Sequence, residues 1–241
     1  MNYKYTSIII EPRKHKALEF VLNNMLECLS NDWKIVFFHG NNNIEYSTLI
    51  VNKLNVIFNN KIQTVNLNVD DLNRKTYSKL LATKSILYDY IDSEYFLVFQ
   101  TDSIMFKRNI NFMNLFIQGN YDYVGAPWLV TDYQPTKDSS FIGNGGFSLR
   151  KTQTMLKIIE NYPWNEECTD PIVFNEDLYF SKHYNNIHML KPSYETAKQL
   201  CVDEVFTDFT MACHRPWCHD HFNKFVEIYP ECGVLKDLQD I

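Results

Sequence analysis

Continuous apolar runs mark the strands expected in the first hundred positions. Such runs predict buried strands over residues 6–11, 33–39 and 94–100, and a shorter one predicts a strand over residues 62–67. The run over 94–100 is the strongest of these, because five consecutive residues in it are aromatic or aliphatic. A central position in a sheet is therefore expected for that strand.

Between these runs, apolar residues recur at the spacing of helices. One apolar set recurs at intervals of three and four residues: Leu18, Val21, Leu22, Met25, Leu26 and Leu29. A short helix over residues 48–55 and a long one over 73–91 follow. Strands that alternate with helices predict an α/β fold in which a mostly parallel sheet is flanked by helices.

The second half of the chain has a less regular pattern. It predicts a short strand over residues 121–125, a polar loop over 130–140 and a helix over 151–161. Residues 143–146 predict a tight turn that leads into another short strand. Asn175 is expected to cap a further helix, with two carboxylates in its first turn.

Composition limits the classes of protein that fit this pattern. The chain has 241 residues, of which 45% are hydrophobic and 22% charged, as expected for one globular domain over residues 1–241. A net charge of −6 argues against nucleic acid as a partner, since such proteins present basic surfaces to phosphates. A nucleotide diphosphate remains compatible, because a bound metal neutralises phosphates locally.

No targeting or membrane segment is evident in the sequence. The first residues are polar, and no stretch approaches the roughly 20 apolar residues of a membrane helix. Six cysteines are scattered along the chain: Cys28, Cys168, Cys201, Cys213, Cys218 and Cys232. We therefore expect reduced thiols, a cytoplasmic location and no membrane span.

Asp102 comes directly after the strongest predicted strand. Ligands of open parallel sheets bind beyond the carboxyl ends of the strands, so this carboxylate is expected in such a crevice. There it would hold Mg²⁺ or Mn²⁺ against phosphates. A simple cap on the following turn explains the position equally well.

The glycines at residues 143–146 require a reason, since three of the chain's 7 glycines fall within four positions. Glycine permits positive φ and lets a ligand approach the backbone, so a sugar or acceptor passing over this turn would explain them. An ordinary hairpin turn at Asn144 and Gly145 is the alternative.

Glu176 and Asp177 are adjacent carboxylates at the predicted helix start. Neighbouring helical residues point in different directions, so one carboxylate can face a cleft while the other serves the structure. A carboxylate beside an acceptor hydroxyl acts as a general base. Favourable electrostatics at a helix start is the competing explanation.

Cysteine and histidine concentrate near the end of the chain. Cys213 and Cys218 with nearby histidines suggest a zinc site, although their spacing departs from the usual one. A second interpretation has His214 complete a metal site with Asp102, and a third leaves the histidines without a ligand. Arg13 follows the first strand, where it would contact a nucleotide or remain a solvated loop charge.

Four segments in fixed order resemble a known family. They cover residues 99–103, 121–128, 143–150 and 175–177. Together they resemble a family of uncharacterised glycosyltransferases with members in bacteria, fungi and giant DNA viruses, and the resemblance extends over residues 9–217. That family is similar to glycosyltransferases of the GT-A type, which implies a Rossmann-like nucleotide-sugar-binding domain.

The resemblance also implies roles for individual residues. Asp102 matches the last aspartate of the GT-A Asp-x-Asp motif, whereas Gln100 replaces the first, a departure that weakens the case for tight metal binding. His214 lies where many GT-A enzymes place a metal-ligating histidine, and Asp177 matches the base, with Glu176 as its alternate. The expected donor-side residues are Arg13, Gln100, Thr101, Asp102, Gly145 and Gly146, and the acceptor-side residues are Trp128 and Asn144.

The sequence thus predicts transfer of a sugar from a nucleotide-diphosphate sugar, with a UDP-sugar favoured, to a hydroxyl of a glycan, lipid or protein. Mn²⁺ or Mg²⁺ is the expected cofactor, and inversion is favoured because a base is present. A viral origin would place the protein in the host cytoplasm or the virion. Two alternatives stay open: a nucleotidyltransferase acting on sugar phosphates, and a non-catalytic nucleotide- or sugar-binding module.

Overall fold

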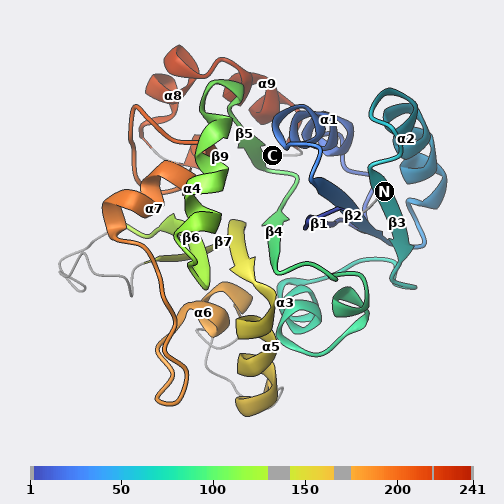
Figure 1. Cartoon of the computed structure of the whole chain (residues 1–241). Helices are drawn as coiled ribbons and strands as arrows, with labels where there is room; N and C mark the ends of the chain where they lie inside the picture. The colour runs from blue at the N-terminus through green and yellow to red at the C-terminus, as the bar shows by residue number, and fades with distance from the viewer. Residues whose placement is uncertain (1–2, 130–141, 166–174, 219, 240–241) are drawn as a thin grey trace.

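A six-stranded sheet in the order β3-β2-β1-β4-β7-β6 forms the centre of the molecule (Figure 1). The computed structural model describes residues 3–129, 142–165, 175–218 and 220–239. The strands are β1 (Tyr5–Ile10), β2 (Trp33–His39), β3 (Ile62–Asn66), β4 (Tyr95–Phe99), β6 (Tyr123–Pro127) and β7 (Ile142–Lys151). The five strands expected before residue 130 are confirmed, because uninterrupted apolar runs are typical of buried strands.

The sheet is mixed rather than purely parallel. Strands β1, β2, β3 and β4 pair in parallel, so their carboxyl ends lie along one edge. Strand β7 runs antiparallel to both β4 and β6. The predicted α/β class with a mostly parallel central sheet is confirmed, and β7 is the exception.

A second, three-stranded sheet in the order β5-β9-β8 lies beside the first. It contains β5 (Ser103–Met105), β9 (Ala212–His214) and β8 (Cys201–Val202). Strand β9 is antiparallel to β5 and parallel to β8. The sequence pattern did not predict these strands, because two or three residues are too few to show a period.

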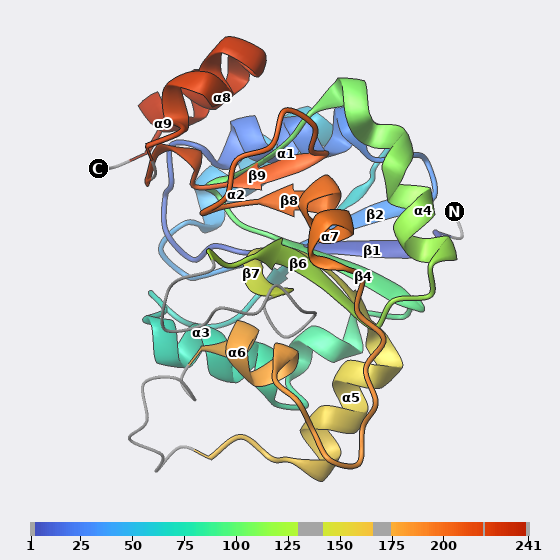
Figure 2. The ribbon, with the colours of Figure 1, turned by 90° about the vertical axis from the view of Figure 1, so that its left-hand side faces the viewer.

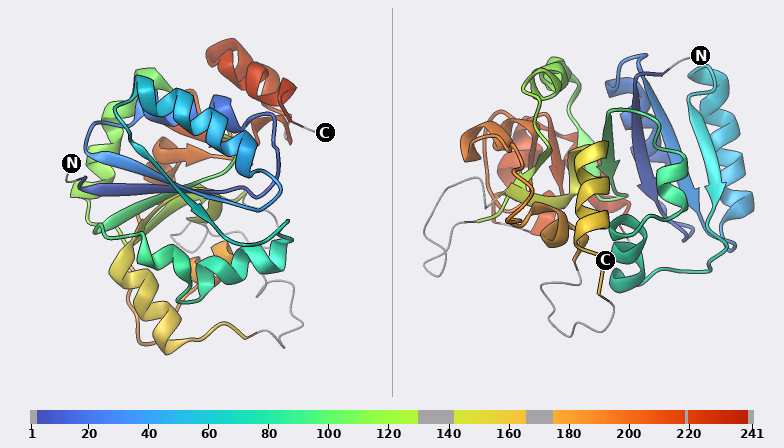
Figure 3. Two further views of the ribbon diagram at one scale, coloured as in Figure 1. Left: turned by 90° about the vertical axis from the view of Figure 1, so that its right-hand side faces the viewer. Right: turned by 60° about the horizontal axis from the view of Figure 1, so that its bottom comes forward.

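Helices cover both faces of the large sheet (Figures 2 and 3). Helices α1 (Leu18–Cys28) and α2 (Ile44–Ile57) pack on the face that buries Ile9, while the opposite face buries Ile8 and Ile10. That face is covered by α3 (Arg74–Ala82), α5 (Thr152–Asn161) and α6 (Glu176–Ser181). The remaining helices of the described residues are α4 (Met113–Gln118), α7 (Tyr194–Leu200), α8 (Phe222–Ile228), α9 (Glu231–Asp237) and the 3₁₀ turns η1 (Ile86–Asp89), η2 (Lys107–Phe112) and η4 (Pro216–Cys218).

The long helix expected over residues 73–91 is wrong. Helix α3 ends at Ala82, and the short turn η1 follows after extended residues. Thr83 donates its hydroxyl to the Lys79 carbonyl, and the Ser85 hydroxyl accepts from the Leu87 amide. Such hydroxyls offer the backbone alternatives to the helical ladder, which explains the break despite the apolar spacing.

The tight turn expected at residues 143–146 is also wrong. These residues lie within β7, which pairs with β4 on one side and β6 on the other. The register with β6 shifts between Gly125 and Ala126, which face Ser148 and Asn144. The residues between them therefore bulge away from β6, and no glycine in the described residues has a positive φ.

Other expectations meet the structure only in part. Asn175 occupies the cap position of α6, but its side chain makes no capping hydrogen bond. The loop expected over 130–140 and the thiol of Cys168 lie outside the described residues. Five cysteines are free thiols: Cys28, Cys201, Cys213, Cys218 and Cys232. None of the described helices has both the length and the apolar composition needed to cross a membrane.

Candidate functional site

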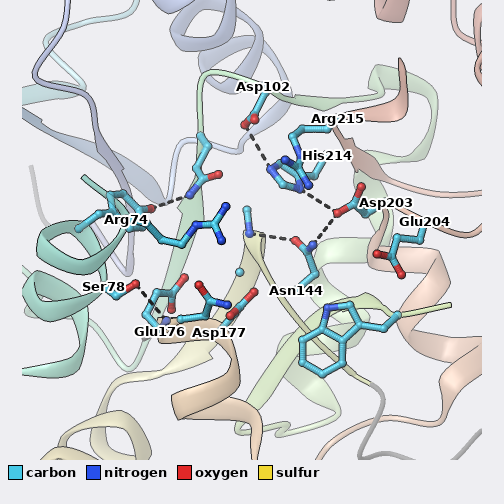
Figure 4. A pocket seen from close by; sticks show the side chains of 16 residues that line it. Arg74, Ser78, Asp102, Asn144, Glu176, Asp177, Asp203, Glu204, His214 and Arg215 are labelled. Atoms are coloured by element: carbon cyan, nitrogen blue, oxygen red, sulfur yellow. Dashed lines mark hydrogen bonds and ion pairs between the residues drawn. The ribbon is translucent and has the colours of Figure 1, made fainter. Parts of the chain in front are cut away.

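A cavity of about 370 Å³ opens where β4 and β7 meet the small sheet (Figure 4). Its walls come from residues after β4, from the bulged part of β7, from the ends of β8 and β9, and from the starts of α3 and α6. The lining residues are Arg74, Tyr77, Ser78, Gln100, Asp102, Trp128, Asn144, Gly145, Gly146, Asn175, Glu176, Asp177, Asp203, Glu204, His214 and Arg215.

The small sheet places two aspartates on either side of one histidine. Ser103 pairs with His214, so Asp102 precedes β5 beside the end of β9. Val202 pairs in parallel with Cys213, which brings the following Asp203 next to His214. Asp102 Oδ1 lies 3.3 Å from His214 Nε2, and Asp203 Oδ2 lies 3.2 Å from His214 Nδ1.

Asp102, His214 and Asp203 form a row in which the two carboxylates determine the electrostatics. Burial alone would lower the pKa of His214, but the charge of Asp102, together with the hydrogen bond and charge of Asp203, raises it to about 9. For Asp102, burial has the opposite effect and would raise the pKa. The charge of His214 and, more weakly, that of Arg215 nevertheless lower it below its ordinary value. The row therefore favours the presence of a positive charge between its carboxylates.

Two residues of β7, Asn144 and Gly146, pack against this row. Asn144 donates from its side-chain Nδ2 to Asp203 Oδ2 at 2.6 Å, and its side-chain Oδ1 accepts from the Gly146 backbone amide at 3.0 Å. A side chain at Gly146 would collide with the His214 ring, and one at Gly145 would collide with Glu176. Adjacent strand residues face opposite sides of the sheet, so the two glycines make room for different walls of the cavity. Close packing, not a left-handed backbone, explains these glycines.

Glu176 is committed to a buried ion pair. Arg150 is fully buried and donates to both carboxylate oxygens of Glu176, at 2.6 and 3.1 Å. Its Nε also donates to the Ser148 hydroxyl at 2.9 Å. Such a bidentate pair fixes the start of α6 and occupies both Glu176 oxygens, so the expectation of Glu176 as an alternate base is not supported by its contacts.

Asp177 points into the cavity beside this pair (Figure 4). Burial, and next the charge of Glu176, raise its pKa to about 6, against smaller opposing effects of the Leu178 amide and Arg150. Its Oδ1 accepts from the Leu178 amide at 2.7 Å. Asp177 is therefore a carboxylate that is charged at neutral pH yet unusually basic.

A second cavity, of about 190 Å³, adjoins the first on the β1 side. Both cavities are lined by Tyr77, Gln100 and Asp102. The remaining walls of the second come from Ile10, Glu11, Pro12, Arg13, Leu72 and Thr101. Gln100 donates its amide to the Tyr77 hydroxyl at 2.9 Å, which fixes the side chain between the two cavities.

Arg13 and Thr101 contact Glu11 rather than the larger cavity. The Arg13 guanidinium donates to both Glu11 oxygens at 2.8 Å, and the Thr101 hydroxyl lies 3.4 Å from one of them. Both residues line the smaller cavity only. The structure thus separates these two candidates from the other predicted site residues, all of which line the larger cavity.

The mouth of the larger cavity carries a tryptophan and two arginines. Trp128 is half-buried, and a side chain at Gly143 would collide with its ring. Arg74 and Arg215 are exposed, and their guanidinium groups have no hydrogen bond or ion pair to any residue that the structure describes. Arg215 adopts a positive φ of 44°, a conformation that is costly for a non-glycine residue and concentrates at functional sites.

Sequence reasoning missed several residues of this site. Asp203 follows a two-residue strand, and its relation to His214 depends on a pairing that no local pattern reveals. Arg150 alternates with apolar residues along β7, which predicts an exposed position, yet it is fully buried. Arg74 and Arg215 carried no signal beyond their charge.

The residues present fit a divalent cation only in part. Asp102 Oδ1 and His214 Nε2 are both buried and have no hydrogen-bond partner among the described residues. Their separation of 3.3 Å is close to the ~3 Å between neighbouring ligands of an octahedral cation. Within the described part of the chain, no group of three or more His, Cys, Asp or Glu residues could hold a metal ion, at Cys213 and Cys218 or elsewhere. Water or phosphate oxygens would complete the shell of a cation here, as they commonly do for Mg²⁺.

Solved glycosyltransferase structures resemble this fold. The S. aureus TarS fragment 1–349 in complex with UDP superposes with a TM-score of 0.55 and 12% identity over 99% of this chain and 67% of that one. Its complex with UDP-GlcNAc gives 0.52 and 13% over 99% and 68%. The mannosyltransferase PcManGT from Pyrobaculum calidifontis, in complex with GDP-Man and Mn²⁺, gives 0.47 and 11% over 68% and 47%. The chain spans roughly half to two thirds of these structures. The TarS superpositions show that its fold is of the GT-A glycosyltransferase type.

Sequence comparison assigns the chain more narrowly. A family model matches residues 60–217, which include the larger part of both cavities. The chain belongs to this family, described as "Protein of unknown function (DUF5672)". No curated protein matches the chain.

Proposed function

We propose that this chain is a glycosyltransferase that moves a sugar from a nucleotide-diphosphate sugar to an acceptor hydroxyl. One observation supports it above all: Asp102, His214 and Asp177 line a single cavity at the carboxyl end of β4, in a fold of the GT-A type. Separate elements contribute these residues, which is typical of a built site rather than of local helix or turn chemistry.

The donor would occupy both cavities. The smaller one, beside the end of β1, suits the nucleoside, and the larger one suits the sugar and the acceptor. Asp102 and Gln100 line both cavities, so the diphosphate would lie beside them. A UDP-sugar is favoured because the TarS structures contain UDP and UDP-GlcNAc.

Asp102 and His214 would hold Mn²⁺ or Mg²⁺ together with the diphosphate. A divalent cation at that place neutralises the charge that develops on a leaving diphosphate. Arg215, exposed at the same wall, would add a fixed positive charge for phosphate oxygens. Gln100 would act through its amide and not as a ligand, which leaves fewer protein carboxylates around the cation than an Asp-x-Asp motif supplies.

Asp177 would take the proton from the acceptor hydroxyl. A pKa of about 6 leaves it ionised at neutral pH and more basic than an ordinary aspartate, which suits a general base. Glu176 would position it by fixing the start of α6 through Arg150. A single base opposite the leaving group corresponds to inversion at the anomeric carbon.

Turnover of a panel of nucleotide sugars, with and without Mn²⁺, tests the proposal. We expect release of the nucleoside diphosphate from one donor, at least a hundredfold slower in Asp102→Asn and Asp177→Asn, roughly the effect of losing a positioned base. Full activity in Asp102→Asn would refute its role. Binding of UDP without any turnover would favour the non-catalytic module, and pyrophosphate release from a nucleoside triphosphate and a sugar phosphate would favour a nucleotidyltransferase.

A further inference from the structure

The imidazole of His214 has a carboxylate at each ring nitrogen. A metal-ligating imidazole is neutral and carries a single N–H, so only one of the two nitrogens can offer a lone pair. Which nitrogen keeps the hydrogen is set by the hydrogen bond that the other makes. The residues around Nδ1 therefore decide whether Nε2 can face a cation beside Asp102.

Asp203 lies where it can accept a hydrogen bond from Nδ1 of His214. Its side chain is almost completely buried, and Oδ2 accepts from Asn144 at 2.6 Å and lies 3.2 Å from His214 Nδ1. An ionised carboxylate only accepts hydrogen bonds, and Oδ2 already accepts one from Asn144, so its hydrogen bond with His214 requires the hydrogen on Nδ1. Nε2, in contrast, has no hydrogen bond to any residue that the structure describes. When the ring is neutral, the hydrogen therefore lies on Nδ1, and Nε2 keeps its lone pair toward the cavity.

We infer that Asp203 is the positioning residue that sets His214 in the Nδ1–H tautomer and so makes Nε2 available to a divalent cation. This inference rests on the proposed function, since it concerns the cation at the same site. Asp203 itself contacts the far side of the ring and does not reach the cation. Its role matches the carboxylate–histidine–metal arrangement in which an outer carboxylate orients the ligand.

The neighbouring contacts restrict the ring to this orientation. Gly146 lies so close to the His214 ring that any side chain there would collide with Cδ2 and Nε2. The Asn144 side chain connects Asp203 to Gly146, because its Nδ2 donates to Asp203 and its Oδ1 accepts from the Gly146 backbone amide. A ring turned over about its long axis would lose the contact between Nδ1 and Asp203.

Mn²⁺ affinity, measured with Mn²⁺ alone through the electron paramagnetic resonance signal of the free ion, tests the inference. Asp203→Ala should weaken Mn²⁺ binding about 10- to 100-fold, the range found when an outer-shell partner is lost. Asp203→Asn keeps an acceptor oxygen but not the charge, so it should fall between Asp203→Ala and the native protein. It also provides the test if the alanine variant does not fold.

Glu204→Gln is the matched control. Glu204 follows Asp203 and lines the same cavity, but its carboxylate accepts from the Leu129 amide and not from His214. Removing this charge should leave Mn²⁺ affinity within about twofold, whereas a general loss of negative charge would weaken both variants alike. Equal affinity of Asp203→Ala, Asp203→Asn and the native protein would overturn the inference.

Histidine tautomers give a readout that does not depend on the metal. Long-range ¹⁵N–¹H spectra of the deprotonated imidazole should show the hydrogen on Nδ1 in the native protein and on Nε2, toward Asp102, in Asp203→Ala. Absence of Mn²⁺ binding in the native protein, with this tautomer change intact, would contradict the metal part of the proposed function and leave the role of Asp203 standing. The Nε2–H tautomer in the native protein would contradict the role of Asp203 itself.

Discussion

Asp177 links the proposed chemistry to the stability of the fold. Its carboxyl group is enclosed by the start of α6 and the bulge of β7, next to the charge of Glu176. These surroundings make the ionised form of Asp177 unfavourable. A high pKa of this kind suits a general base, but it lowers the stability of the fold at neutral pH. Asp177→Asn should therefore abolish transfer and stabilise the protein at neutral pH.

The size of the effect follows from the pKa of Asp177. A carboxyl group whose pKa rises from 3.8 in the unfolded chain to about 6 in the folded one destabilises the ionised folded state by about 3 kcal/mol. Because the folded pKa is the higher one, the folded state binds the extra proton between the two values. This contribution to stability is present below about pH 4 and is lost as the pH rises through about 6.

Urea unfolding of the native protein and Asp177→Asn at about pH 4 and about pH 8 measures this contribution. The two proteins should be similar at the lower pH, and the variant should be more stable by up to about 3 kcal/mol at the higher one. Asparagine keeps an oxygen for the Leu178 amide, so the cap at that amide is not lost. Glu204→Gln controls for removal of a charge from the same cavity.

The activity of the native protein should follow the same ionisation. Transfer should rise with pH through about 6, as Asp177 loses its proton and becomes able to accept one. An unfolding free energy that does not differ between the two proteins at either pH would refute the electrostatic account of Asp177. A variant that is stabilised but still fully active would refute only its role as the base.

Two substitutions at the site, Gly146→Ala and Glu176→Gln, test its packing, and Gly233→Ala is the control for the first. Gly146→Ala should push the His214 ring aside, reduce stability by about 1–3 kcal/mol and weaken Mn²⁺ binding. Gly233→Ala, which has room in α9, should raise stability by about 0.5 kcal/mol. Thermal unfolding compares the two variants, and equal effects would contradict the close-packing explanation. Glu176→Gln leaves the buried Arg150 without its counter-charge and should reduce the free energy of unfolding by about 3–5 kcal/mol, and a change below about 1 kcal/mol in urea would show that the pair is not needed.

Much of the fold was predictable because burial determines where apolar residues recur along the sequence. The continuous apolar runs of β2 and β4 reflect burial on both faces, and the spacing in α1 reflects one buried side. The break after α3 was not predictable from that trace, since hydroxyls at Thr83 and Ser85 decide it. Local hydrogen bonds of this kind leave hydrophobic spacing unchanged.

The candidate site divides in the same way. Asp102, Glu176 and Asp177 follow or begin regular elements, so their place at one edge of the sheet could be inferred from element order. Asp203 could not, because its contact with His214 depends on the register of two very short strands. The glycines of β7 resemble a turn in the sequence for a related reason: their neighbours in space come from β9 and α6, far away in the sequence.

The central claim is that Asp102 and His214 hold a divalent cation against a nucleotide diphosphate. Crystals grown with UDP and Mn²⁺, measured where manganese scatters anomalously, test it most directly. The account predicts an anomalous peak within about 2.0–2.4 Å of Asp102 Oδ1 and of His214 Nε2, bridged to the diphosphate. A nucleotide bound in these cavities with the manganese elsewhere, or with none, would contradict it.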